Sequence, residues 1–435
     1  VTIRFSERIE LDSSSIKVLA PNGLEIGQTP IIDSSDPRLY RVPIQVGGDG
    51  KYTVTWHVVS VDDGHFTKGA FAFSADQNAV AKAGSVFQPA TVSTVTRFSE
   101  ALIGTMSLLG ESIFLGVLVL LFIARRTIAG ASTEIEHITK RTAKLYLYSC
   151  ALIVMGSGGY ILIKTNDLNT LREGTFFETL PLFMRTLGGE HALYKIGTTL
   201  LLVALIVVQK KRSQLFGLTT FLGLTIGISA VVYFQAVVSH ASASFFHPEL
   251  SVVITAVHLA GKELLVGIPF VLVGMGAYLY RTLGREQTFR LSATIAALAI
   301  LVAGVTGTYV TWLHLRAGAH LTDTLWGERF ISLLLVGLTL GAFRLLHGPL
   351  LPWVNRDNNR TSLLTKTLIA ECVVGMFVLV YSSYISITTP PFVVESYAYS
   401  VTATNENVDF ELSVPNARPN TFAVSLTAHD TKEGD

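Results

Sequence analysis

The sequence predicts a multi-domain membrane protein: a small all-β domain first, then eight long apolar helices, then a short second β-domain. Of the 435 residues, 49% are hydrophobic and only 15% are charged, whereas soluble domains carry about 25% charged residues. The apolar residues are concentrated between positions 98 and 389, and both flanks alternate polar and apolar residues as β-strands do. This composition excludes a disordered chain, and a net charge of +1 gives no reason to expect a nucleic-acid partner.

The first β-domain is expected over residues 1–75. Segments such as "YTVTWHVVSV" and "GAFAFSA" are rich in β-branched and aromatic residues, and "PNG", "GGDG" and "DDG" mark turns between them. Short strands at this spacing indicate an immunoglobulin-like β-sandwich. The chain starts inside a strand-like segment without a signal peptide or initiator Met, so we expect its beginning to be incomplete. Residues 76–98 are a polar linker.

Eight segments are long and apolar enough to cross a bilayer, which takes roughly 20 residues of helix. They are residues 99–124, 143–164, 190–209, 215–239, 251–280, 291–314, 328–346 and 363–388. These spans define a membrane domain over residues 99–389. Residues 390–435 alternate again, as in "VDFELSV", and are expected to form an incomplete C-terminal β-domain.

Loop charge predicts the orientation of these spans. Lys and Arg cluster after the first, third, fifth and seventh spans, whereas the loop "SHASASFFHPELS" after the fourth has neither. Because cytoplasmic loops carry an excess of basic residues, the loops that follow the odd-numbered spans are predicted to be cytoplasmic. We therefore expect a multi-pass protein of the cytoplasmic membrane, in contact with the lipid bilayer, with both termini extracytoplasmic.

Asp63 and His65 stand two positions apart in the segment "DDGH". On an extended segment this spacing places two side chains on one face, and a carboxylate with an imidazole suits Cu(II), which takes N and O ligands in a square plane. The same letters also fit an ordinary turn in which Asp63 bonds its own backbone and His65 is exposed. Residues 1–105 contain no Met and no Cys, so we expect this domain to bind Cu(II) only.

Histidines gather at the predicted outer ends of the spans. They are His191, His240, His247, His258, His314 and His320, against His137 and His347 on the cytoplasmic side. His240 ends the fourth span and His258 begins the fifth, so a short outer loop makes them expected neighbours.

Four ionisable residues are noted inside the spans: Glu111, Lys262, Glu263 and Glu371. Such groups are costly in a membrane and usually point toward a pathway. We expect His240 and His258, with His191 and Glu263, to take copper at an outer entrance. A structural ion pair, for instance between Lys262 and Glu111, is the alternative.

Several motifs resemble copper proteins of the CopC and CopD families. "VTIRFSERIE" and "WHVVSVDDGHFTKGAFAFS" resemble CopC strands, and "VVSHA", "VHLAGKELLVG", "DTLWGERFISLL" and "IAECVVGMFVLVYSSYISITTPP" resemble CopD. The last segment resembles the β-domain that follows CopD in YcnJ-type fusions, so the resemblance covers nearly the whole chain. It implies that Asp63 and His65 are copper ligands, joined by an N-terminal His and its amine that this sequence lacks. The segments around His240 and His258 match the CopD pattern.

The resemblance implies copper binding and transport, with import as the expected direction: the outer domain captures Cu(II) and the helices move copper inward. Cys372 and Met376, one turn apart, and Cys150 with Met155 could hold Cu(I) inside the membrane, although such residues ordinarily pack against neighbouring helices. Two other functions stay open. One is a haem-binding electron carrier with two axial histidines. The other is a copper storage or insertion partner of a membrane copper enzyme or copper chaperone. No "GxSxG", "HExxH" or "GxxxxGK[ST]" segment is present, so we expect a non-enzyme.

Overall fold

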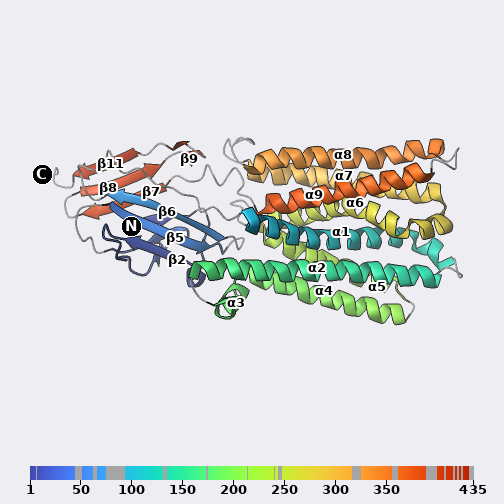
Figure 1. Cartoon of the computed structure of the whole chain (residues 1–435), viewed down its shortest axis with the longest axis horizontal. Helices are drawn as coiled ribbons and strands as arrows, with labels where there is room; N and C mark the ends of the chain where they lie inside the picture. Colours follow the sequence, from blue (N-terminus) through green and yellow to red (C-terminus); the bar gives the residue numbers. More distant parts are fainter. Residues whose placement is uncertain are drawn as a thin grey trace.

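The fold is described from a computed structural model of the chain. It describes residues 1–430 with these gaps: residues 6, 45–50, 62–65, 75–93, 131–134, 173–174, 213, 240, 243–246, 316–324, 355–360, 388–398, 406–407, 415–416, 419–420 and 423–424. Strands gather at one end of the molecule and long helices at the other (Figure 1).

The N-terminal part is a small β-sheet domain with two antiparallel three-stranded sheets. One sheet has the order β1-β4-β3 and the other β2-β5-β6. The bounds are β1 Thr2–Arg4, β2 Ser15–Leu19, β3 Ile31–Ile32, β4 Leu39–Arg41, β5 Lys51–Val59 and β6 Phe66–Ser74, with a 3-10 turn at Leu11–Ser13.

The two sheets share one apolar core. Ile3 and Tyr40 come from the first sheet, and Val54 and Trp56 come from the second. Phe5 bridges them, since its ring lies edge-on to both Tyr40, at 5.6 Å, and Trp56, at 6.4 Å. Alternate residues of β5 are buried, which is the period-two pattern of a strand with one face on a core. The immunoglobulin-like topology itself stays a prediction.

Nine helices follow among the described residues. They are α1 Thr94–Gly130, α2 Ile135–Arg172, α3 Phe176–Met184, α4 Leu187–Lys211, α5 Leu218–Val237, α6 Pro248–Leu283, α7 Arg285–His314, α8 Leu325–Val354 and α9 Thr361–Ser386. All except α3 run along the long axis of the molecule, and successive long helices run in opposite directions (Figure 1). The connections that the sequence predicted to be rich in Lys and Arg therefore lie at the end of the bundle away from the strands.

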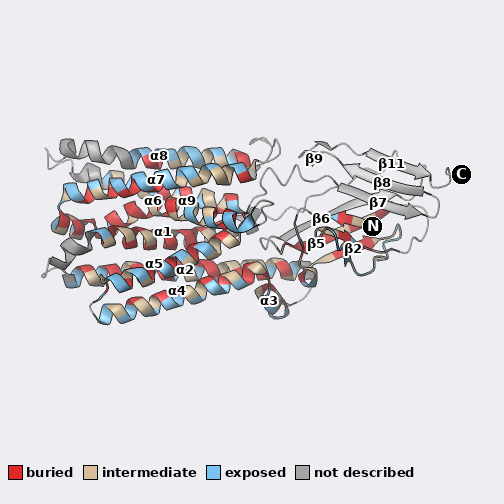
Figure 2. Ribbon diagram, turned by 180° about the vertical axis from the view of Figure 1, so that it is seen from behind, coloured by how far each residue is buried: buried red, intermediate tan, exposed pale blue. Residues whose placement is uncertain are grey.

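Seven helices of the described chain are long and apolar enough to cross a membrane, and they confirm seven of the eight predicted spans. The eighth, residues 328–346, is helical within α8, but its described apolar stretch, Arg329–Phe343, is shorter than a span. Figure 2 shows exposed residues along the outward faces of α4 and α7, where Leu200, Leu201 and Leu301 are exposed. Large apolar side chains on the outside indicate a multi-pass membrane protein.

Helix α3 was not predicted, because its nine residues are too few to stand out as a membrane-spanning apolar run. Thr175 and Glu178 form a capping box at its start: the Thr175 amide donates to Glu178 Oε2 at 3.0 Å and the Thr175 hydroxyl at 2.7 Å. These bonds lower the pKa of the Glu178 carboxyl. The spacing T-x-x-E was visible in the sequence and marks a helix start.

Small residues let α1 and α6 cross closely in the middle of the bundle. A Cβ atom at Gly267 would collide with the backbone of Ser112, and one at Gly116 would collide with the backbone of Gly267. Because neither position has a side chain, the two backbones meet directly.

The described C-terminal strands form an antiparallel sheet of order β11-β8-β7, with a separate β9-β10 pair. Their bounds are β7 Tyr399–Asn405, β8 Val408–Val414, β9 Ala417–Arg418, β10 Thr421–Phe422 and β11 Ser425–Asp430. Strand β7 lies beside β1 of the N-terminal domain. These strands do not establish a separate domain over residues 390–435, which stays a prediction.

Candidate functional site

The predicted Cu(II) ligands Asp63 and His65 lie outside the described residues. The strands on either side of them are described: β5 and β6 pair in register from Lys51↔Ser74 to Val59↔Phe66. The chain between Val59 and Phe66 is therefore the connection of a β-hairpin, as the turn signal "DDG" predicted.

The β5 end of this hairpin touches the helical bundle. Val59 is fully buried in an apolar cluster with Ile161 and Leu168 of α2, Phe183 of α3 and Ala192 of α4. The β-domain thus rests on three helices at the end of the bundle that lies nearest the strands.

Carboxylates surround this contact. Burial, together with the nearby charges of Asp12 and Glu190, raises the pKa of the Glu10 carboxyl. Asp12 belongs to the β-domain and Glu190 to the first turn of α4, and the Glu10 amide donates to the Val59 carbonyl at 2.8 Å. Like charges therefore face each other where the two parts meet.

A cavity of about 270 Å³ lies at the same end of the bundle. Helices α1, α2 and α4–α9 all contribute to its wall. Among the described residues, its ionisable side chains are Glu100, Lys164, His191, Lys195, His258 and Lys262. Two of the predicted copper ligands, His191 and His258, therefore line one cavity although they lie on different helices.

Both histidines are held by a backbone carbonyl. His191 lies in the first turns of α4, which Thr186 caps by accepting from the Gly189 amide, and its Nδ1–H donates to Leu187 O at 2.9 Å. His258 Nδ1–H donates to Ala303 O of α7 at 3.0 Å. Since a carbonyl only accepts, Nδ1 carries a hydrogen in each ring, and in the neutral form of the ring the Nε2 lone pair is the one open to a ligand.

Neither of the other two predicted ligands is among the described residues that line the cavity. His240 lies outside the described residues. Glu263 is fully buried and does not line the cavity; its nearest charges are Glu111, Lys262 and Lys195. Within the described part of the chain, no three His, Cys, Asp or Glu side chains form a group that could hold a metal ion. The full ligand set therefore stays a prediction.

The buried ion pair differs from the one the sequence analysis named. Glu111 Oε1 pairs with Lys195 of α4 at 2.6 Å, and Lys195 also donates to Gln235 of α5 at 2.5 Å. The Ser107 hydroxyl donates to the same carboxylate at 2.9 Å. The predicted partner of Glu111, Lys262, is thus wrong. Lys195 was missed, although it is the one Lys inside the predicted span 190–209 and could have been found there.

A second ion pair joins α1 and α2 at the wall of the cavity. Lys164 contacts Glu100 at 2.6 Å, and both side chains are about nine-tenths buried. These two pairs tie α1 to α2 and α4, and they fix the position of two cavity lysines.

The sulfur residues of α2 do not form a pair. Cys150 is fully buried in the bundle core, whereas Met155 is 58% exposed on its outside. They cannot hold one Cu(I) ion together. Cys372 and Met376 are both half-buried on α9, and a role for them stays a prediction.

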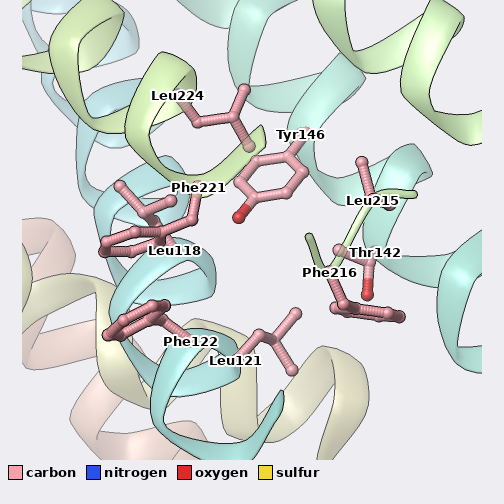
Figure 3. A pocket seen from close by; sticks show the side chains of 9 residues that line it. All are labelled: Leu118, Leu121, Phe122, Thr142, Tyr146, Leu215, Phe216, Phe221 and Leu224. Atoms are coloured by element: carbon pink, nitrogen blue, oxygen red, sulfur yellow. The ribbon is translucent and has the colours of Figure 1, made fainter. Parts of the chain in front are cut away.

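A much smaller pocket lies in the other half of the bundle, near the α4–α5 connection (Figure 3). Its volume is about 20 Å³, and leucine and phenylalanine side chains make most of its wall. That volume is close to the roughly 10–15 Å³ that one water needs.

The N-terminal part of the chain is similar to known proteins. Residues 1–76 match the family model described as the CopC domain. Three curated proteins named Protein YobA, from Escherichia coli K12, Escherichia coli O6:H1 and Shigella flexneri, are each 41% identical to this chain over 76 residues. That stretch is 17% of this chain and 60% of each relative, so the chain spans about three fifths of their length.

No solved structure matches the chain. The N-terminal domain is therefore a CopC domain similar to YobA, which implies copper binding, and a long helical region with candidate membrane spans follows it. CopD is named in none of these matches.

Proposed function

We propose that this protein binds Cu(II) with its CopC domain and moves copper inward across the cytoplasmic membrane. The observation that carries the proposal is the joining of two parts. A domain of the copper-binding CopC family rests on a helical bundle, and a polar cavity lined by two histidines lies at that same end.

The chemistry of the cavity supports copper as cargo. Imidazole nitrogen is a good ligand for copper, and the Nδ1 atoms of His191 and His258 bond backbone carbonyls, which leaves Nε2 of each neutral ring for copper. Copper held at Asp63 and His65 in the β5–β6 connection would pass to these nitrogens, with His240 and Glu263 as further candidate ligands. Cys372 and Met376 would suit Cu(I) deeper in the membrane, and reduction of copper is not needed for this first transfer.

The contact at Val59 supports a direct transfer. Ala192 lines the cavity and also packs in the cluster that contains Val59. The hairpin that carries the proposed Cu(II) ligands therefore meets the bundle beside the cavity, so copper would travel a short distance between the two parts.

The distribution of charge supports an orientation with both termini outside. Lys140, Arg141, Lys210, Lys211 and Arg285 all lie at helix ends remote from the β-strands. Cytoplasmic ends carry such basic residues, so the CopC domain and the cavity would face the extracytoplasmic side.

We propose that this protein is a transporter and not an enzyme. The sequence has no nucleotide-binding loop or conventional catalytic motif. Copper would move because cytoplasmic ligands, such as a copper chaperone or a membrane copper enzyme, bind it after passage.

The proposal is tested with the full chain in sealed vesicles, using an indicator trapped inside to measure copper uptake. Wild-type protein should raise uptake above that of protein-free vesicles. The double variant His191→Ala/His258→Ala should lower it by about tenfold or more, the scale on which metal-site changes act. His137→Ala, an exposed histidine of α2 at the other end, is the matched control.

Copper that binds to the wild-type protein without entering the vesicles would overturn transport and favour storage or delivery to a partner. Normal uptake by the double variant would overturn the cavity as the route.

A further inference from the structure

The cavity is large for a bare metal ion. Its volume of about 270 Å³ is many times the roughly 10–15 Å³ that one water needs. A copper ion bound to two imidazoles would leave most of this space to other groups.

The lysines of the wall also offer binding positions for a carboxylate. Among the described residues that line the cavity, three are lysines and one is a carboxylate. Lys164 and Lys195 have carboxylate partners at 2.6 Å, whereas the carboxylates that interact with Lys262, Glu263 and Glu111, do not lie within ion-pair distance of it. Lys262 lies one helical turn after His258, so the two side chains share a face of α6. A guest that brings a carboxylate together with copper would therefore meet an ammonium group and an imidazole side by side.

Hydroxyl groups of the wall lack partners. The Ser157, Thr255 and Ser382 hydroxyls are buried and make no hydrogen bond with the described residues. Thr255 is one turn before His258 on α6. Buried polar atoms without partners are costly, so these hydroxyls indicate a guest that brings polar atoms of its own.

We propose, on the basis of the transport function proposed above, that the cavity takes copper as a small chelate with amino-carboxylate ligands, such as the neutral Cu(II) bis-glycinate. Such a chelate surrounds Cu(II) with two amines and two carboxylate oxygens in the square plane that Cu(II) prefers. Lys262 binds a carboxylate of the chelate, and His258 Nε2 approaches the copper from an open position. No electron transfer is involved: His258 Nε2 adds one bond to copper at that open position, and no bond between copper and the chelate has to break.

The test compares two copper buffers at the same free Cu(II) activity, with the full chain in sealed vesicles. One buffer contains glycine, and the other contains iminodiacetate fixed to a polymer too large to enter the cavity. Wild-type protein should take up copper more than about tenfold faster from the glycine buffer, the scale of losing one buried charged contact. Lys262→Gln should remove this advantage, and Lys262→Arg should keep it. Lys140→Gln, an exposed lysine at the other end, should behave as wild type.

A binding measurement gives a second readout that does not depend on transport. Detergent-solubilised wild-type protein should retain radiolabelled glycine only when copper is present. Equal uptake from both buffers, or no glycine retained with copper, would overturn the chelate. Uptake from neither buffer would overturn the transport function instead, so the two failures are distinguishable.

Discussion

The two ends of the helical bundle differ in the size of their cavities and in the side chains that line them. The outer cavity, beside the CopC domain, is about 270 Å³ and is lined by lysines, histidines and hydroxyls. The inner pocket is about 20 Å³, and in Figure 3 the ring of Tyr146 faces leucine and phenylalanine side chains across it. Phe122 and Phe221 stack there with ring centroids 3.6 Å apart.

This difference shows where the chain accepts the cost of buried polar groups. Glu111, Lys195 and Glu263 are each at least nine-tenths buried near the outer cavity. Charges inside a membrane protein are expensive, so a bundle that only needed stability would resemble its inner end throughout. The end beside the CopC domain is therefore the part whose lining suits the polar cargo proposed above.

The largest expected effect comes from the buried ion pair. Glu111→Gln leaves the Lys195 ammonium without its carboxylate, and breaking such a pair costs about 3–5 kcal/mol in the free energy of unfolding. Replacing both residues, in Glu111→Leu/Lys195→Met, should recover most of the loss because no charge stays unpaired. Denaturant unfolding in detergent measures both values.

Two variants test whether this sensitivity belongs to the outer end. Tyr146→Phe removes a polar atom from the inner pocket and should change the free energy of unfolding by less than about 0.5 kcal/mol, because the Tyr146 hydroxyl makes no described hydrogen bond. Glu136→Gln, in an exposed pair with Lys140, should cost equally little. A loss at either site as large as that of Glu111→Gln would remove the contrast between the two ends.

An intermediate effect is expected where α1 and α6 cross, between the two cavities. Gly267→Ala places a methyl group against the Ser112 backbone and should cost about 1–3 kcal/mol by overpacking. Gly274→Ala is the matched control on the same helix, because its added Cβ would meet Leu145 at an ordinary 3.6 Å. It should be neutral or stabilising by up to about 1 kcal/mol through helix propensity. Equal losses in both variants would contradict a close backbone crossing.

The smallest effect is expected at the contact between the CopC domain and the bundle. Burial and the charges of Asp12 and Glu190 raise the pKa of the Glu10 carboxyl. Because Glu190 belongs to α4 of the bundle, its repulsion of ionised Glu10 opposes docking. Docking should therefore be strongest at low pH and weaken as pH rises from about 4.5 through the raised pKa.

Pulsed EPR between spin labels at the exposed positions Lys17, in β2, and Phe177, in α3, measures the distance between the CopC domain and the bundle. Glu10→Gln should hold the short distance at every pH between about 3 and 8, a range that brackets the usual Glu pKa of about 4.3. A distance that depends on pH equally in Glu10→Gln would assign the effect to another group.

The sequence predicted where the helices lie along the chain better than it predicted which residues of different helices meet. Apolar runs identify spans because each run reflects its own surroundings, and seven of eight were confirmed. The pairing of Glu111 with Lys195 depends on how α1 and α4 are placed by the helices between them, which no local pattern encodes. The short helix α3 had a local signal, the capping box at Thr175, that a search for membrane spans passes over.

The candidate site was predictable by residue type but not by arrangement. Outer histidines were expected together, and His191 and His258 do line one cavity. Glu263 carries the right chemistry, but its helical position places it behind that wall. The lysines of the wall change which form of copper the cavity favours, and their importance followed only from the packing of several helices around one space.

The most direct test of the account is the copper signal of the purified full chain, followed by EPR and optical spectroscopy during Cu(II) titration. We expect two copper components: one lost in Asp63→Ala/His65→Ala and the other lost in His191→Ala/His258→Ala, with no Soret band in any sample. A copper signal that survives both double variants would contradict the account. A Soret band that disappears with His191 and His258 would contradict it equally, because it would assign those imidazoles to haem.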